Sequence, residues 1–275
     1  MYKRVLLALD LEGVNHVVGE PYRGLERDTE QWKIAREQAV SEVNAAAEAL
    51  FEAGVEIVGL WDNHGGGKNI DPNALDPRIT LIPIDNKMPR MYFADGNYDC
   101  ICFFGYHAME GTLGGVLAHT MSSKTVQYYK LNGNYIGEVD MDAYIAAAKG
   151  IPARFFAGGD IACKQAKRAV SEIVTVTTKT ELSRNEAVFR DNEELLADIR
   201  KNIVHAVKNE EKPYPLCFPA TLEKSFKRVE DAAKYLKRLR AAGLRADYLD
   251  DAILGKDAHT VASTICEIGD LIKGI

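Results

Sequence analysis

The chain opens with Val5-Leu6-Leu7-Ala8-Leu9-Asp10-Leu11-Glu12-Gly13, an apolar strand pattern that ends in two carboxylates. Side chains of a strand alternate with period two, so Asp10 and Glu12 are expected to point to the same side at the strand's end. Three more strand-like runs lead to His64, His107 and Glu138. Two acids there, with two histidines and another acid arriving from other strands, suit one or two divalent ions such as zinc.

This set of residue types predicts a metal-dependent hydrolase. A two-metal site needs anionic oxygen to bridge cations about 3.5 to 4 Å apart, neutral imidazoles to complete each coordination shell, and open positions for water and substrate. Taken singly, each residue also has an ordinary structural explanation. Asp10 could serve as a helix cap or turn residue, His64 lies in a glycine-rich loop, and Glu138 is an acid at a helix start.

Strand and helix patterns alternate through the first two thirds of the chain, which is typical of an α/β fold. We expect a layered, mostly parallel central sheet with flanking helices, and the metal site at the carboxyl ends of its strands. Asp28 is expected to cap the first helix and Gly54 to end it. The predicted strands cover residues 5–9, 55–61, 79–84, 100–106 and 152–156, with a hairpin at Asn132-Gly133 and helices at 141–148 and 160–169.

Beyond about residue 180 the pattern changes, and a smaller C-terminal α+β part is predicted. Its expected elements are helices over 185–208, 229–242 and 258–272, a strand within 216–226, and a Pro-rich link at 212–215. The candidate ligands all precede residue 140. The sequence therefore predicts a catalytic metal-binding domain over 1–180 and a part for support and assembly over 181–275.

Composition narrows the class of protein. The chain has 275 residues, of which 47% are hydrophobic and 27% charged, with a net charge of -6. This balance argues against nucleic acid as a partner, because phosphate binding needs a concentrated basic surface. The basic run from Lys224 to Arg240 is interleaved with acids and is expected to be a solvated face. No export signal or membrane span is predicted. Five scattered cysteines indicate buried free thiols and a cytoplasmic protein.

Five segments, in order and at matching spacing, resemble the signature segments of the zinc-dependent D-aminopeptidase family, the DppA-type metallopeptidases. They are Leu9-Asp10-Leu11-Glu12-Gly13, Asp62-Asn63-His64, Gly105-Tyr106-His107-Ala108, Ala118-His119-Thr120-Met121, and Gly137-Glu138 with Ala143-Tyr144. The similarity continues through Asp160 and Ser183-Arg184, and its clear part covers about residues 4 to 185.

The resemblance implies that Asp10, Glu12, His64, His107 and Glu138 hold two zinc ions per subunit, with Asp10 as the bridge. It implies that His119 is the catalytic residue outside the metal shell, acting as acid, base or oxyanion stabiliser. A metal-activated water would release N-terminal residues, including D-amino acids, from short peptides. The resemblance also implies a homodecamer of two stacked pentameric rings with the active sites facing an inner chamber.

Two other functions stay open at this point. A two-metal hydrolase of a non-peptide amide or a phosphate ester would use the same ligands, but a phosphatase should also hold phosphate with a basic residue or a helix N-terminus. Lys68 is the obvious candidate for that role, and Gly65-Gly66-Gly67-Lys68 lacks the spacing of a P-loop. A non-catalytic metal-binding or scaffold protein would have no need of His119.

Overall fold

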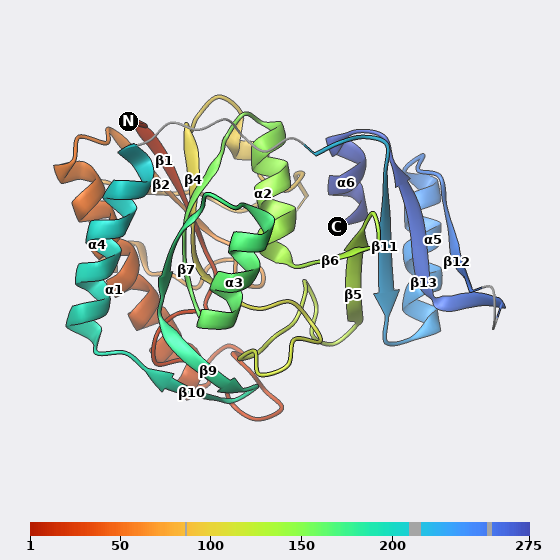
Figure 1. Ribbon diagram of the computed structural model, residues 1–275, viewed down its shortest axis with the longest axis horizontal. Helices are drawn as coiled ribbons and strands as arrows, with labels where there is room; N and C mark the ends of the chain where they lie inside the picture. The colour runs from red at the N-terminus through yellow and green to blue at the C-terminus, as the bar shows by residue number, and fades with distance from the viewer. Residues whose placement is uncertain (86, 209–215, 252–254) are drawn as a thin grey trace.

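Two β-sheets stand side by side in the computed structural model, which describes residues 1–85, 87–208, 216–251 and 255–275 (Figure 1). The larger sheet has six strands in the order β3-β2-β1-β4-β7-β8, and all of its pairings are parallel. Its strands are β1 (Arg4–Leu9), β2 (Ile57–Asp62), β3 (Ile79–Leu81), β4 (Cys100–Tyr106), β7 (Ala153–Gly158) and β8 (Val174–Thr177). The mostly parallel α/β sheet expected from the sequence is confirmed.

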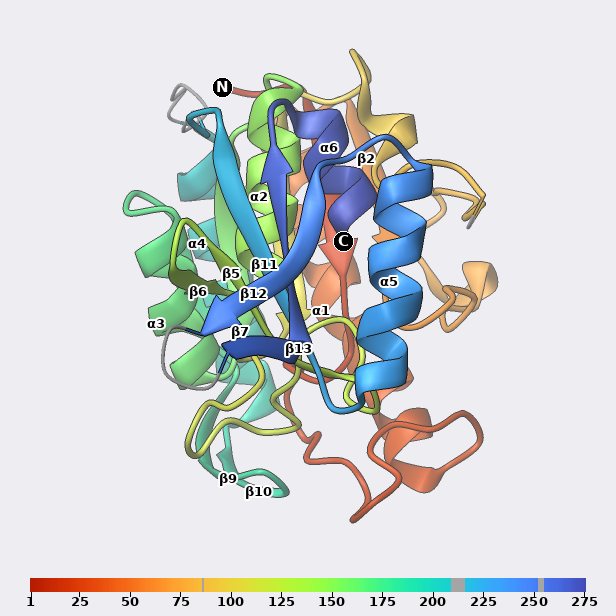
Figure 2. The same cartoon turned by 90° about the vertical axis from the view of Figure 1, so that its right-hand side faces the viewer.

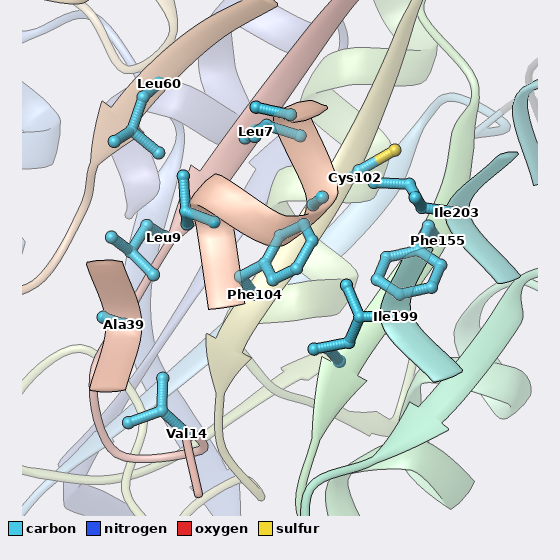
Figure 3. Close-up of a cluster of buried hydrophobic side chains, with 14 of the residues drawn as sticks. Leu7, Leu9, Val14, Ala39, Leu60, Cys102, Phe104, Phe155, Ile199 and Ile203 are labelled. Atoms are coloured by element: carbon cyan, nitrogen blue, oxygen red, sulfur yellow. The ribbon is translucent and has the colours of Figure 1, made fainter. Parts of the chain in front are cut away.

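Helices cover both faces of this sheet. On one face lie α1 (Glu30–Glu52) and α4 (Asn192–Lys208), and on the other lie α2 (Glu138–Ala148) and α3 (Asp160–Ala169). The alternation along β1 supplies both cores, because Leu7 and Leu9 pack toward α1 while Leu6 and Ala8 pack toward α2. Figure 3 shows Leu7, Leu9, Phe104 and Ile199 together in the first of these cores.

The second sheet has five strands in the order β12-β13-β11-β5-β6. They are β5 (Val126–Leu131), β6 (Asn134–Ile136), β11 (Ala220–Phe226), β12 (Ala246–Asp251) and β13 (Gly255–Ile265), and all of their pairings are antiparallel. Figure 2 looks onto this sheet, with α5 (Val229–Ala241) packed along it. The last helix, α6 (Ile268–Gly274), lies between β13 and α2 (Figure 1). Two short 3₁₀ helices, Pro72–Ala74 and Tyr92–Ala94, complete the list with the hairpin β9 (Lys179–Ser183) and β10 (Glu186–Phe189).

Local signals placed many of these elements as expected. The predicted strand over 100–106 matches β4, and the Asn132-Gly133 turn joins β5 to β6 with both residues at positive φ. Gly54, at φ 92°, follows the end of α1. The cap of α1 is Thr29, whose side chain accepts a hydrogen bond from the Trp32 amide, and not the predicted Asp28.

One predicted helix was wrong, and another begins later than expected. The segment expected to begin a helix at Asn185 forms β10, which pairs with β9, and α4 begins only at Asn192. The helix expected over 258–272 is the strand β13 followed by the short α6. Val261 and Ile265 are four residues apart and imitate a helical repeat, but Ser263 between them is buried too, which is the period of a strand. The β-branched residues of this segment favour the strand.

The structure corrects the expectations for the cysteines and for the basic face, and it does not describe the predicted Pro-rich link. Cys217 and Cys266 are exposed, although all five cysteines are free. Lys224 is buried, with its ammonium over the Tyr129 and Tyr235 rings, and so does not belong to a solvated basic face. The predicted link at 212–215 lies outside the described residues. No helix in the described part of the chain is both long and apolar enough to cross a membrane.

The two sheets do not follow the predicted division at residue 180. The hairpin of β5 and β6 comes from the first part of the chain but pairs with β11 of the second. Helix α4 comes from the second part but packs on α1 and the parallel sheet. The division of the chain into a catalytic domain over 1–180 and a supporting part over 181–275 stays a prediction.

The ends of β1 and β4 touch through two glycines. The Gly13 amide donates to the Gly105 carbonyl at 2.6 Å, and a Cβ on Gly105 would lie 2.0 Å from the Asp10 carbonyl oxygen. A Cβ on Gly13 would lie 2.1 Å from the Tyr106 carbonyl oxygen. Gly105 also has a φ of +67°, which other residues rarely adopt. Only glycines allow the backbone next to Asp10 and that next to His107 to lie so close.

Gly105→Ala is expected to lower the free energy of unfolding by about 3 kcal/mol or more, because left-handed strain and a backbone clash add together. Gly133→Ala is the matched control. Gly133 has a similar φ of +78° but no atom within 4 Å of an added Cβ, so it should lose only about 1 kcal/mol. Urea unfolding of both variants measures the difference. Equal losses would show that the close contact at Gly105 does not carry the effect.

Candidate metal centre

Five of the predicted site residues meet at the carboxyl edge of the parallel sheet. Asp10 and Glu12 follow β1, His64 follows β2, His107 follows β4, and Glu138 is the first residue of α2. Ligand atoms of Asp10, Glu12 and His64 form one group close enough to hold a metal ion, and those of Asp10, His107 and Glu138 form another. Asp10 belongs to both groups, so its two carboxylate oxygens lie between the two candidate positions.

The first group is arranged around His64. Its Nδ1 atom lies 3.0 Å from Asp10 Oδ1 and 3.1 Å from Glu12 Oε2. The loop that carries His64 is closed by Asp62, whose carboxylate accepts hydrogen bonds from the backbone amide and the side-chain amide of Asn69 at 2.6 and 2.9 Å. The Asn69 side chain also donates to the His64 carbonyl. These hydrogen bonds therefore fix the two ends of the loop that contains the glycines after His64.

The second group leaves a buried nitrogen without a partner. His107 donates from Nδ1 to the Ala108 carbonyl at 2.9 Å, so its Nε2 atom carries the lone pair once the ring is neutral. That Nε2 is buried with no hydrogen-bond partner among the described residues, and it lies 3.5 Å from both Asp10 Oδ2 and Glu138 Oε1. An orphaned imidazole nitrogen facing two carboxylate oxygens fits a metal ion between them.

The charges of the site keep protons on the histidines. Burial opposes the charged form of His64, but the Glu12 carboxylate next to it raises the pKa of His64 to about 11. Burial likewise opposes the charge on His107, yet Glu138 raises the pKa of His107 to about 10. Burial and the charge of Glu12 raise the pKa of Asp10 to about 7. Because metal ligands must be deprotonated, a bound cation would replace these protons.

His119 lies against this cluster from a different segment. Its ring stacks on His107 with centroids 4.0 Å apart and planes 12° apart, and its Nε2 atom lies 3.9 Å from Glu138 Oε1. Nδ1 of His119 donates to the Leu117 carbonyl at 2.8 Å, so the neutral ring carries its lone pair on Nε2. Burial and the positive charge of His107 lower the pKa of His119. Glu12, His107 and His119 also form a third group at metal-binding distance.

The His119 segment is strained and is held from outside. Leu117 and Met121 both have positive φ, 50° and 63°. The Arg184 carbonyl accepts a hydrogen bond from the Leu117 amide at 2.9 Å, and Arg184 Nη1 donates to the Ala118 carbonyl at 2.8 Å. Arg184 thus forms hydrogen bonds with the backbone of Leu117 and of the next residue, Ala118. The Leu117 carbonyl in turn orients the His119 ring.

The same hairpin region holds the loop that follows Glu12. Lys179 at the start of β9 is fully buried, and its ammonium donates to the carbonyls of Glu12, Val14 and Val17 at 2.6, 3.0 and 2.5 Å. The Thr178 hydroxyl donates to the Gly13 carbonyl at 2.6 Å. A buried ammonium with three carbonyl acceptors binds this loop as a structural cation would, and it fixes the backbone at Glu12.

The site opens into a cleft of about 510 Å³. Asp10, Glu12, His64, His119 and Glu138 all line it, while His107 lies beneath, with its side chain 1% exposed. The segment from Glu20 to Glu26 and the residues from Met121 to Lys124 form other parts of the wall. The structure therefore brings all six predicted site residues together at one opening.

Other residues that shape this site were not foreseen. Arg90, Asp142 and Lys179 had no assigned role. Asp142 carried a usable signal, because it stands four residues after Glu138 on the same helix face. Arg90 and Lys179 are single basic residues without a motif, and only the fold brings them to the site.

Comparison with known proteins places this arrangement among peptidases. The sequence model of a family described as D-aminopeptidase matches residues 3–243. The chain is 25% identical over 217 residues to a D-aminopeptidase of Bacillus subtilis (strain 168), covering 78% of each chain. It also superposes on the zinc-dependent D-aminopeptidase DppA from Bacillus subtilis, described as a self-compartmentalizing protease. That TM-score is 0.83 at 20% identity, over 98% of this chain and 94% of the other.

Zinc binding to the metal-free protein is expected to release protons and to tighten as the pH rises from about 6 to 9, because protons on His64 and His107 compete with the metal. Titration calorimetry in buffers of different ionisation enthalpy counts the protons. His64→Gln should release fewer protons than the unaltered protein. A buffer-independent enthalpy together with a pH-independent affinity would contradict this account of the site.

Arg184→Met is expected to lower kcat by about 10- to 100-fold, since a small displacement of a catalytic group has effects of that size. KM and zinc content should change little, because Arg184 contacts the His119 segment and no candidate ligand. Arg184→Lys should recover part of kcat, and Arg240→Met, in α5, serves as the control. Loss of zinc in Arg184→Met with kcat per zinc unchanged would show that the grip on Leu117 does not matter for catalysis.

Proposed function

This chain belongs to the D-aminopeptidase family, and on that premise we propose that it is a zinc-dependent aminopeptidase that removes N-terminal residues, D-amino acids among them, from short peptides. The match confirms the resemblance inferred from the five signature segments. The observation that carries the proposal is the Asp10 carboxylate, which is shared by two groups of metal-binding side chains at the floor of an open cleft.

In this proposal Asp10, Glu12, His64, His107 and Glu138 would hold two zinc ions, and Asp10 would be the ligand common to both. The donor set of three carboxylates and two imidazoles suits zinc, and the orphaned Nε2 of His107 supports its assignment as a ligand. When bound, the ions would activate water and polarise the scissile carbonyl. The remaining steps fall to the protein's own side chains.

His119 would move the proton. Burial lowers the pKa of His119, which favours the neutral ring, and the hydrogen bond from Nδ1 to the Leu117 carbonyl leaves the lone pair on Nε2. Nε2 can accept a proton from the attacking water and then pass it to the leaving nitrogen of the peptide, so that one residue serves as base and then as acid. The Leu117 carbonyl keeps the tautomer that this sequence of steps requires. The stacked His107 restricts the ring to one plane.

The dimensions of the site favour short substrates. A cleft of about 510 Å³ is of the size that holds small ligands and short peptides. Its walls carry charges of both signs, such as Glu20, Arg23 and Lys124, which can meet the charged ends of an unblocked peptide. A phosphate ester is less well served, because the first turn of α2, where a phosphate could bind, is occupied by Glu138.

We propose the same homodecamer of two pentameric rings that the family resemblance implies. Large apolar side chains that are exposed in the single chain support burial against other copies, and they include Tyr22, Leu113, Leu182 and Val188. Such a chamber would admit only short peptides. Five free cysteines support a reducing location such as the cytoplasm.

The function is tested by hydrolysis of paired D- and L-aminoacyl dipeptides, before and after chelation and zinc restoration. Hydrolysis should disappear with the metal, return with zinc and favour the D-aminoacyl peptides. His119→Ala should lower kcat by about 100-fold or more, with two zinc ions per subunit retained. A fall to one zinc would make His119 a ligand. No hydrolysis of any peptide by the fully metallated protein would refute the proposed function.

A further inference from the structure

Arg90 is a cleft cation that the mechanism above leaves unused. It precedes the short helix Tyr92–Ala94, and it lines the cleft together with Glu138. Its Nε and Nη2 atoms donate to the two carboxylate oxygens of Asp142 at 2.5 and 2.8 Å. The Asp142 side chain is fully buried, while that of Arg90 is 20% exposed. The buried Asp142 carboxylate therefore acts as an anchor that fixes the partly exposed guanidinium of Arg90 at the cleft.

The anchor is tied to the backbone that carries the metal ligands. Asp142 Oδ2 also accepts the Tyr106 hydroxyl at 2.7 Å, and that hydroxyl accepts the Asn63 side-chain amide at 2.9 Å. Asn63 precedes His64, Tyr106 precedes His107, and Asp142 stands one helical turn after Glu138. The guanidinium is thus held in a defined place relative to three of the proposed zinc ligands.

The edge of Arg90 that faces away from Asp142 is available. The interaction with Asp142 uses Nε and Nη2, and Nη1 donates to no described residue. Arg90 also borders a second cavity of about 170 Å³, whose apolar walls include Ile84 and Met88. A planar guanidinium with a free edge is suited to bind a carboxylate through two parallel hydrogen bonds.

The other described cations of the cleft are less suited to this role. Arg23 pairs with Glu20 and Glu26, and Lys124 pairs with Glu26 as well. These pairs lie on largely exposed loops, where ion pairs contribute little and side chains move freely. Arg184 donates to the Ala118 carbonyl. Arg90 alone among these cations is anchored by a fully buried carboxylate.

A dipeptide carries its charged carboxyl end close to the scissile bond. Its α-carboxylate follows the scissile carbonyl by one residue, a span of about 3.3 to 3.6 Å. Although burial opposes its charge, the Asp142 carboxylate raises the pKa of Arg90. Arg90 and Glu138, which is a proposed zinc ligand, line the same cleft. A cation here would attract the carboxylate end and repel the N-terminal ammonium.

We propose that Arg90 binds the free α-carboxylate of the residue released from the carboxyl side of the cut, so that unblocked dipeptides are the preferred substrates and Ile84 and Met88 accept the side chain of that residue. This inference rests on the proposed aminopeptidase function. It adds a length limit and a binding site for the leaving amino acid.

The test compares alanyl-alanine with alanyl-alaninamide, each in the all-D and all-L forms, using the zinc-loaded protein. The free acid should exceed the amide in kcat/KM by about 10- to 100-fold, which is the usual effect of a charge-assisted pair. Most of this difference should lie in KM. In Arg90→Met/Asp142→Asn, which removes both charges together, the ratio of acid to amide should fall to about one.

Two further variants separate binding from folding. Arg78→Met/Asp76→Asn removes an exposed pair with the same two-pronged geometry outside the cleft, and it should keep the ratio of the unaltered protein. Arg90→Lys keeps a charge beside Asp142 but lacks the planar fork, so the ratio should fall even if the double variant does not fold. Zinc content verifies that each variant retains its metal site.

The outcomes distinguish the two proposals. Hydrolysis of acid and amide with equal kcat/KM, or an unchanged ratio in both Arg90 variants, would overturn the carboxylate site and leave the aminopeptidase function standing. No hydrolysis of any of the four substrates would refute the function itself, and the carboxylate site with it.

Discussion

The contact between Gly13 and Gly105 is the constraint on which the site depends. The backbone after β1 and the carboxyl end of β4 lie so close together that neither Gly13 nor Gly105 has room for a Cβ. This brings the backbone that carries Asp10 and Glu12 next to the backbone that carries His107. Parallel pairing of β2 with β1 then delivers His64 to the same edge, and α2 begins there with Glu138. A ligand set drawn from four separate segments needs such a shared edge.

The loop after Glu12 and the segment of His119 must also be held in place. The β9–β10 hairpin and the residue before it, Thr178, supply the hydrogen bonds that do this. Lys179 and Thr178 hold the loop after Glu12, and Arg184 holds the segment of His119. Glu181, between them, accepts the Val116 amide at 2.7 Å. One short element therefore holds both the loop after Glu12 and the segment of His119. Positive φ at Leu117 persists because these bonds surround it.

The buried polar groups around the site form connected networks. Hydrogen bonds of 2.5 to 2.9 Å connect Asn63, Tyr106, Asp142 and Arg90, and the first three of these residues are neighbours of candidate metal ligands. Hydrogen bonds that share partners in this way hold the side chains in one arrangement in a low-dielectric interior. The antiparallel sheet takes part in a different way, because its hairpin of β5 and β6 leads directly into Gly137 and Glu138.

Local sequence determined five of the six strands of the parallel sheet, all but β8, together with the position of each candidate ligand at a strand or helix end and the hairpin at Asn132-Gly133. These features depend on short-range periodicity and turn chemistry, which neighbouring residues decide. The signature segments also predicted that Asp10, Glu12, His64, His107, Glu138 and His119 form one site, because their order along the chain is distinctive, and the structure brings these six side chains together.

Tertiary structure alone decided the rest. The segment after Asn185 became a strand because β9 offered an edge to pair with, and β13 became a strand because β11 and β12 lie on either side of it. Lys179 and Arg90 gained their positions from partners 167 and 52 residues away along the chain. A lone basic residue has no periodicity, so its place is set by which buried carbonyl or carboxylate the fold puts beside it.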